Sequence, residues 1–225
     1  MKIYKYETAK ADGRKWIQYD DVPFPDGYTP EDTGISRPDT WQAPHVRYNA
    51  MRDEWVAISA SRQDRPFLPP KEYCPLCPQK EVQFDSSGNE IKTEIPRGDR
   101  GYKWAVFENI FPGLSLSGEP TGHCEVVLYS PEHTGTLGDC DENHIKGLVH
   151  VWQDRSRSIG EFKDIKQVFI FENKGPEIGV TLHHPHGQIY SFTEVPPFLK
   201  KEQEVAARHY EEKGSCLVCD LVTME

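Results

Sequence analysis

The sequence lacks both a long apolar run and a basic stripe. No segment approaches the roughly 20 apolar residues of a membrane-spanning helix, and Met1–Tyr6 has no apolar core of a secretory signal. We therefore expect a cytoplasmic protein with no membrane partner. The formal net charge is −10, so we expect no nucleic-acid partner either. An anionic substrate would need a locally placed arginine, lysine, helix N-terminus or metal ion.

The chain has six cysteines. Two Cys-x-x-Cys pairs are among them, and without an export signal such pairs favour metal or redox chemistry over disulfides. Cys74 and Cys77 place two thiolates on one turn, which is half of a tetrahedral zinc site. A thioredoxin-type redox pair is the alternative, but the surrounding prolines disfavour the helix that it would open. Cys216 and Cys219 are either spare thiols at a frayed end or the start of a further module.

The rest of the composition suits a folded chain. Its 225 residues are 36% hydrophobic and 11% aromatic, which is enough for a core in one large domain or one and a half ordinary ones. Residues 1–44 are rich in proline, glycine and aspartate and predict an irregular arm, although an opening strand or hairpin is compatible with them. Residues 79–100 predict a loop. Short apolar runs predict strands at 45–49, 54–59, 102–107, 122–129 and 168–171.

Two segments predict helices. Asp139 followed by Glu142 resembles the capping box that starts a helix. The apolar stripe that follows has helical spacing and consists of Ile145, Leu148, Val149 and Trp152. A charged segment from about Pro197 to Glu212 predicts the second helix.

The most informative segment is His184-Pro185-His186-Gly187-Gln188. On an extended strand, His184, His186 and Gln188 project to one face. Proline donates no N–H, so the strand should begin here or run along a sheet edge. Three aligned polar groups beside proline and glycine indicate a functional site. Upstream, Arg62 and Arg65 leave a strand end and are either solvated or bind a phosphate.

Four motifs in order resemble galactose-1-phosphate uridylyltransferase, the transferase branch of the histidine-triad superfamily. They are Cys74-x-x-Cys77, Ser130-Pro131-Glu132-His133, Glu172-Asn173-Lys174-Gly175 and His184-Pro185-His186-Gly187-Gln188. The resemblance runs from about His45 to Glu202. It implies an α+β fold, in which a histidine-triad-like antiparallel sheet forms a half barrel with helices packed on its outer face. It also implies a division into an arm (1–44), the first catalytic module of a two-module enzyme (45–212) and the start of a second module (213–225).

The resemblance assigns chemistry to the histidine segment. His186 resembles the nucleophile that takes UMP from UDP-glucose, and galactose 1-phosphate then accepts UMP from the uridylyl-histidine. Neutral imidazole is a competent nucleophile near pH 7. Gln188 resembles the amide that donates to a phosphoryl oxygen. The implied activity is that of a UDP-glucose:hexose-1-phosphate uridylyltransferase of galactose metabolism.

The same resemblance assigns ligands and binding residues. A structural zinc ion is implied, since four protein ligands leave no open position for hydrolytic chemistry. Its ligands resemble Cys74, Cys77, His133 and His184. Glu202 resembles one ligand of a second metal site in some members, but the partner histidines would belong to the second module, so no second metal is expected. The residues that resemble substrate-binding positions are Arg62, Arg65, Leu76, Asn109, Asn173 and Thr181.

Two alternatives remain open at this stage. Ile110 follows Asn109 where the family often has a charged residue, which mildly favours an adenylyl-transferring sister enzyme acting on ADP-sugars or dinucleoside polyphosphates. The other alternative is a zinc-stabilised half-module that only binds nucleotide or a partner chain. The resemblance implies a homodimer, or a complementing chain that carries the second module.

Overall fold

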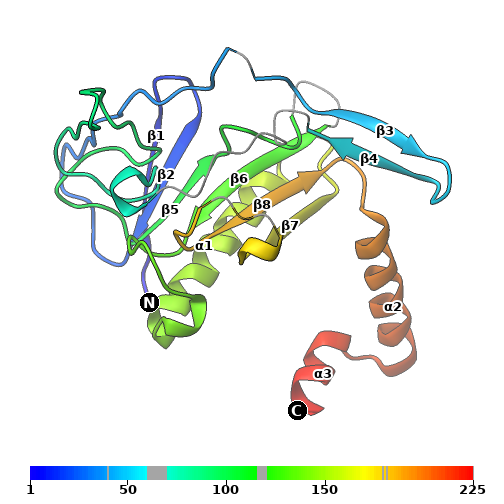
Figure 1. The fold of residues 1–225 in the computed structure, drawn as a ribbon. Coiled ribbons are helices and arrows are strands. Elements are labelled where there is room, and N and C mark those ends of the chain that lie inside the picture. Colours follow the sequence, from blue (N-terminus) through cyan, green and yellow to red (C-terminus); the bar gives the residue numbers. More distant parts are fainter. Residues whose placement is uncertain (40, 60–69, 116–120, 179, 181, 225) are drawn as a thin grey trace.

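The computed structural model describes residues 1–39, 41–59, 70–115, 121–178, 180 and 182–224. Its centre is one open antiparallel sheet of six strands in the order β1-β2-β5-β6-β8-β7 (Figure 1). The strands are β1 (Tyr4–Ala9), β2 (Lys15–Asp20), β5 (Trp104–Glu108), β6 (Gly122–Leu128), β7 (Gln167–Phe171) and β8 (His186–Phe192). The strand carrying the histidine segment, β8, therefore lies inside the sheet, between β6 and β7.

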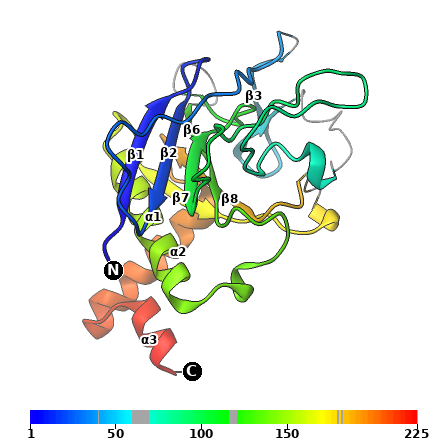
Figure 2. The same ribbon diagram turned by 90° about the vertical axis from the view of Figure 1, so that its left-hand side faces the viewer.

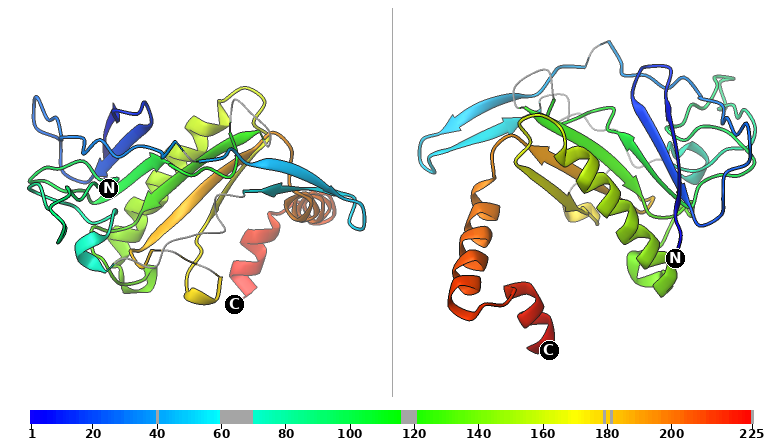
Figure 3. Two further views of the ribbon diagram at one scale, coloured as in Figure 1. Left: turned by 45° about the horizontal axis from the view of Figure 1, so that its top comes forward. Right: turned by 180° about the vertical axis from the view of Figure 1, so that it is seen from behind.

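Helix α1 (Glu142–Gly160) covers one face of the sheet (Figure 3). Helix α2 (Pro197–Lys213) contacts the edge strand β7 through Phe198 against Phe169, and Leu199 is its buried residue. Helix α2 then leads away from the sheet to α3 (Leu217–Met224). The predicted α+β class is confirmed, with α1 as the helix that packs on the sheet. Within the described residues, no helix is long and apolar enough to cross a lipid bilayer.

The two faces of the sheet have separate hydrophobic cores. Figure 2 shows α1 on one side of the sheet and the loop region of residues 70–100 on the other. Neighbouring residues of a strand point to opposite faces, so Ile17 packs in the core under α1 while Trp16 packs in the other. That second core is closed by the loop region of residues 70–100, which contributes Leu76 and Ile95. Close approach of α1 depends on Gly147, because a Cβ there would meet the Trp104 ring at 2.2 Å. One face is thus sealed by a helix and the other by loops.

The opening hairpin that residues 1–44 allow occupies the first half of this stretch, and the described residues of the second half are irregular. Strands β1 and β2 form the hairpin, and β2 pairs with β5 in the main sheet. The reason is hydrophobic: Trp16, Ile17 and Tyr19 are each at most 2% exposed and supply both cores. The prolines and most of the glycine and aspartate residues of this stretch come after the hairpin, from Asp21 onward.

The start of α1 also differs from the prediction. Asp141 is the N-cap, and its carboxylate accepts a hydrogen bond from the His144 N–H. Asp139 instead ends a short 3₁₀ helix, in which it closes a capping box with Thr136. On α1 the buried stripe includes Leu148 and Val151, whereas Val149 is exposed. Two capping residues close together in sequence serve two consecutive helices.

The predicted strands at 45–49 and 54–59 form a separate ribbon, β3 (His45–Asn49) and β4 (Glu54–Ile58). It extends away from the six-stranded sheet (Figure 1). Exposed apolar side chains on it include Met51 and Trp55, which are 97% and 67% exposed. Arg62 and Arg65 follow this ribbon in sequence and lie outside the described residues.

A buried ion pair joins α1 to the sheet. Arg155 donates two hydrogen bonds to Glu125, at 2.9 and 2.6 Å, and both side chains are almost fully buried. Burial by itself raises the pKa of Glu125, but hydrogen bonds from His123 and Arg155 outweigh it and lower the pKa below its ordinary value. The folded state therefore holds this carboxylate in its charged form.

We expect Glu125→Gln to lower the free energy of unfolding by about 3 to 5 kcal/mol, because it leaves the Arg155 charge buried without a counter-charge. A carboxyl whose folded pKa is lowered stabilises above its unfolded pKa, so the difference should be constant above about pH 5 and shrink on acidification. Urea denaturation measures it. Glu142→Gln, which removes the exposed pair with Lys146, is the control and should change stability by less than about 0.5 kcal/mol. Equal losses of unfolding free energy in the two variants would contradict a stabilising role for the buried Glu125–Arg155 pair.

Candidate metal centre and active strand

Strand β8 begins at His186, directly after Pro185. The missing N–H of Pro185 therefore costs no ladder hydrogen bond, as predicted. Along the strand, His186 and Gln188 lie on the half-buried face, while Gly187 and Ile189 point into the core under α1. His184 precedes the strand, and its side chain is 1% exposed, so it is enclosed whereas His186 and Gln188 are half-buried.

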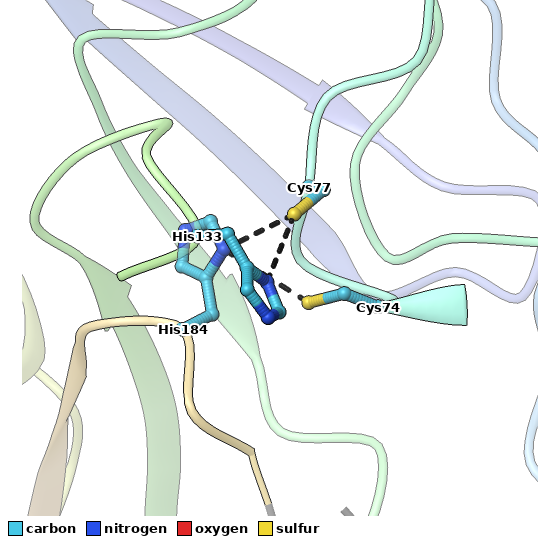
Figure 4. A group of neighbouring side chains, drawn as sticks. All are labelled: Cys74, Cys77, His133 and His184. Atoms are coloured by element: carbon cyan, nitrogen blue, oxygen red, sulfur yellow. Dashed lines mark hydrogen bonds between the residues drawn. The ribbon is translucent and has the colours of Figure 1, made fainter. Parts of the chain in front are cut away.

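His184 belongs instead to a four-residue cluster with Cys74, Cys77 and His133 (Figure 4). One candidate ligand atom from each residue lies within 4.8 Å of the others. The Cys77 Sγ is 3.3 Å from the His133 Nδ1 and 3.5 Å from the His184 Nδ1, and the Cys74 Sγ is 3.9 Å from the same His184 atom. Three segments that are distant in sequence thus converge on one point beside β8.

The proton arrangement of His184 suits a metal ligand. Its Nε2 lies 2.8 Å from the Ser130 carbonyl oxygen, and a carbonyl only accepts, so Nε2 carries the proton. The Nδ1 lone pair then faces the two sulfurs. Tetrahedral zinc would separate sulfur and nitrogen ligands by roughly 3.5 Å, close to the observed 3.3 to 3.9 Å. The cluster therefore fits a tetrahedral metal ion.

The two sulfurs of the cluster are electrostatically coupled. A hydrogen bond from Cys77 lowers the pKa of Cys74 to about 4, although burial opposes the shift. The same contact, together with burial, raises the pKa of Cys77. The pair therefore favours a Cys74 thiolate that accepts a hydrogen bond from the Cys77 thiol. A divalent cation would displace the thiol proton, because the thiolate is the ligand form.

Tyr102 connects the parts of this cluster through its hydroxyl, and it was not among the predicted site residues. Its hydroxyl lies 3.0 Å from the carbonyl oxygens of Leu76 and Ser130 and 2.8 Å from the His184 Nε2. The phenol is 4% exposed and joins the cysteine loop to the end of β6. A lone tyrosine at the start of a predicted strand carries no signal that would have revealed this role.

His186 is held by the backbone of His184. Its Nδ1 lies 2.7 Å from the His184 carbonyl oxygen, so Nδ1 carries a proton and Nε2 keeps a lone pair. Burial lowers the pKa of His186 below its ordinary value, so the ring is neutral near pH 7. The neutral tautomer with a free Nε2 is the nucleophilic form of imidazole.

A pocket of about 150 Å³ opens beside His186. It is much smaller than the 300 to 1,000 Å³ typical of small-ligand sites, but it suits a phosphoryl-sized group. The lining residues are Gly135, Glu172, Asn173, Lys174, Gly175, Val180, Leu182, His183, His184, Pro185 and His186. Three further residues line the pocket although the sequence did not identify them as site residues: Glu172, Lys174 and His183. The first two flank Asn173, which was predicted to bind substrate.

The other predicted binding residues have different positions. Asn173 lines the pocket with His186. Asn109 follows β5, and its side-chain oxygen accepts a hydrogen bond from the Phe111 N–H. Leu76 is 2% exposed and packs in the core beneath the cysteine loop, so its side chain is covered. Thr181, like the two arginines, lies outside the described residues.

An open antiparallel sheet with a four-residue cysteine–histidine cluster and an oriented histidine on the adjoining strand has the architecture of the histidine-triad-like proteins. Residues 116–196 match the family model of the galactose-1-phosphate uridyl transferase N-terminal domain. Galactose-1-phosphate uridylyltransferase of Thermotoga maritima is 37% identical over 80% of this chain and 56% of its own. That of Streptomyces lividans is 34% identical over 98% of this chain and 58% of its own.

Solved structures agree with the sequence relatives. A uridylyltransferase structure matches with a TM-score of 0.58 and 27% identity, covering 80% of this chain and 56% of that one. An ADP-glucose phosphorylase from Arabidopsis thaliana with bound ADP-glucose matches with a TM-score of 0.52 and 25% identity over 80% of this chain and 59% of that one. The chain belongs to the galactose-1-phosphate uridyl transferase family and contains its N-terminal domain. It spans just over half the length of these relatives.

We expect Tyr102→Phe to lower the free energy of unfolding by about 1 to 3 kcal/mol, because buried carbonyl oxygens lose their donor. The control is Tyr48→Phe, whose hydroxyl makes an exposed bond to Asp53, and it should cost less than about 0.5 kcal/mol. Chemical denaturation of both variants measures the difference. A Tyr102→Phe variant as stable as the control would rule out the linking role of this phenol.

Proposed function

We propose that this chain supplies the nucleophilic half of a UDP-glucose:hexose-1-phosphate uridylyltransferase of galactose metabolism. The observation that carries the proposal is the hydrogen bond from the His186 Nδ1 to the His184 carbonyl oxygen. With the proton on Nδ1, the Nε2 of the neutral ring keeps its lone pair. The family membership and the adjoining pocket support the proposal. Substrate preference is part of the proposal, because relatives of both uridylyl and adenylyl type share this fold.

The proposed reaction has two displacements. The His186 Nε2 lone pair forms a bond to the α-phosphorus of UDP-glucose, and the bond from that phosphorus to the bridging oxygen breaks, so the electron pair leaves with glucose 1-phosphate. A phosphate oxygen of galactose 1-phosphate then attacks the same phosphorus. The N–P bond breaks, its electron pair returns to Nε2, and UDP-galactose leaves. No other reactant is consumed.

Neighbouring residues would orient the reacting phosphate. Gln188 shares the face of His186 on β8, and its amide would donate to a phosphoryl oxygen whose charge develops in the transition state. Asn173 would act from the pocket lining. We also propose substrate contacts for Arg62, Arg65, Asn109 and Thr181. Leu76 is left out because its side chain is covered.

We propose zinc as the metal of the Cys74, Cys77, His133 and His184 cluster. Four protein ligands fill a tetrahedral coordination shell, so the ion would be structural and hold the cysteine loop against β8. The protein would keep His186 oriented through the backbone of the ligand His184.

The expected metal content is one zinc ion per chain by mass spectrometry of the metal. Cys77→Ser should lose the ion and lower the melting temperature, since structural zinc contributes folding free energy. Cys140→Ser is the matched control, because Cys140 lies outside the cluster. A Cys77→Ser variant that retains full zinc and stability would contradict the site.

We further propose that more protein completes the site, either in a second copy of this chain or in a separate chain carrying the second module. The small pocket and the share of each relative covered support this. In this proposal residues 45–212 form the catalytic module, extended by the hairpin of β1 and β2, and residues 213–225 begin a further module.

Incubation with UDP-glucose, followed by intact-mass measurement at neutral pH, tests the chemistry. We expect an adduct of ~306 Da on the wild-type chain, the mass of a uridylyl group on histidine. His186→Asn should abolish it, because the asparagine amide can still donate to the His184 carbonyl but offers no nucleophilic nitrogen. His150→Asn, on the exposed face of α1, is the matched control and should keep the adduct.

The same measurement separates the alternatives. ADP-glucose in place of UDP-glucose would give an adduct of ~329 Da if the chain transfers adenylyl groups. The bound ADP-glucose of the Arabidopsis structure makes this the second candidate. No adduct with either substrate would contradict the proposed activity for this chain alone and would favour a nucleotide- or partner-binding half-module.

A further inference from the structure

The pocket beside His186 has one side chain with a fixed positive charge among its described lining residues, Lys174. Its other charged lining residue is Glu172, whose pKa is raised by burial. A chain with a net charge of −10 repels a phosphate unless cations are placed locally. Lys174 is therefore placed where an anionic group reacting at His186 would need a counter-charge.

The ammonium group of Lys174 is weakly engaged. Its Nζ donates to the Gly135 carbonyl oxygen at 3.2 Å, in an exposed position. Other lysines, including Lys10 and Lys103, form ion pairs with carboxylates. Among the described residues, Lys174 donates to this neutral carbonyl, and the nearby Glu172 carboxylate also attracts its charge. An anion could replace such an acceptor at little cost, because a charged acceptor binds an ammonium more strongly than a carbonyl does.

The backbone positions Lys174 between the metal cluster and the active strand. Its turn leaves β7 just after Phe171, which pairs directly with Gln188 on β8. Gly175 continues the turn with φ +100°, a conformation that favours glycine. On the opposite side, Gly135 lies two residues beyond the cluster ligand His133. The hydrogen bond from Lys174 to Gly135 therefore spans the two loops that flank the pocket.

We propose that Lys174 is a phosphate-binding residue of the transfer site. Its ammonium moves from the Gly135 carbonyl to an oxygen of the phosphate that reacts at His186. Lysine suits this role as a compact charge on a flexible stem. The inference rests on the proposed function for the identity of the nucleotide, and on the pocket geometry for the phosphate contact itself.

Calorimetric titration of the 225-residue chain with UMP and with uridine tests the contact directly. Lys174→Met keeps side-chain length and removes the charge, so it should weaken UMP binding at least about tenfold while leaving uridine binding unchanged. Lys174→Arg should stay within about threefold of wild type for UMP, since the charge is kept. Lys146→Met, on the exposed face of α1, is the matched control and should bind both ligands as wild type does.

A parallel titration with AMP and adenosine separates this inference from the nucleotide identity. A loss confined to the phosphate-bearing member of either pair supports the role of Lys174, whether or not a covalent adduct forms. Equal UMP and AMP binding by Lys174→Met and wild type overturns it, as does the absence of nucleotide binding by the wild-type chain. A lower melting temperature of Lys174→Met with unchanged UMP affinity also overturns it, because Lys174 would then only hold the two loops together.

Discussion

The organisation of the site depends on one residue, His184, which takes part in two interactions at once. Its imidazole faces the two cysteine sulfurs through Nδ1, and its backbone carbonyl accepts the Nδ1 proton of His186. The position of the cluster and the tautomer of the nucleophile are therefore coupled over two residues. A displacement of the cysteine loop would be transmitted to His186 through this carbonyl, so a structural metal here has a direct consequence for the chemistry.

The sheet provides the rigid support for this coupling. Helix α1 covers the core on one face of the sheet, with Gly147 packed against Trp104. The buried Arg155–Glu125 pair also joins the helix to the sheet. On the other face, the loop region of residues 70–100 covers β2, β5 and β6 and leaves β8 half-buried at His186 and Gln188. The closed part of that face holds the metal cluster, and the open part presents the reactive side chains. The metal cluster and the reactive side chains thus occupy separate parts of one face of the sheet.

Local patterns explain which predictions were correct. Alternating or short apolar runs predicted strands at 45–49, 54–59, 102–107, 122–129 and 168–171, close to their observed bounds. These predictions are local, because residues two apart in a strand lie on the same face and share its burial. Errors arose where the partner is distant. The β1–β2 hairpin was not predicted outright, because the residues that follow it are rich in proline, glycine and aspartate. Only pairing of β2 with β5 explains why Trp16 and Ile17 are buried on opposite faces.

The sequence by itself determined the chemistry available: the residue types of the four motifs, their order, and the family to which they belong. Only the tertiary structure decided how these residues are used. It enclosed His184 in the cluster, covered Leu76, and brought Tyr102 and Lys174 to the cluster and the pocket. The physical reason is that a sequence motif contains only residues that are neighbours along the chain. Proton positions, burial and pocket walls depend on groups that sheet pairing and loop packing bring together across more than fifty residues.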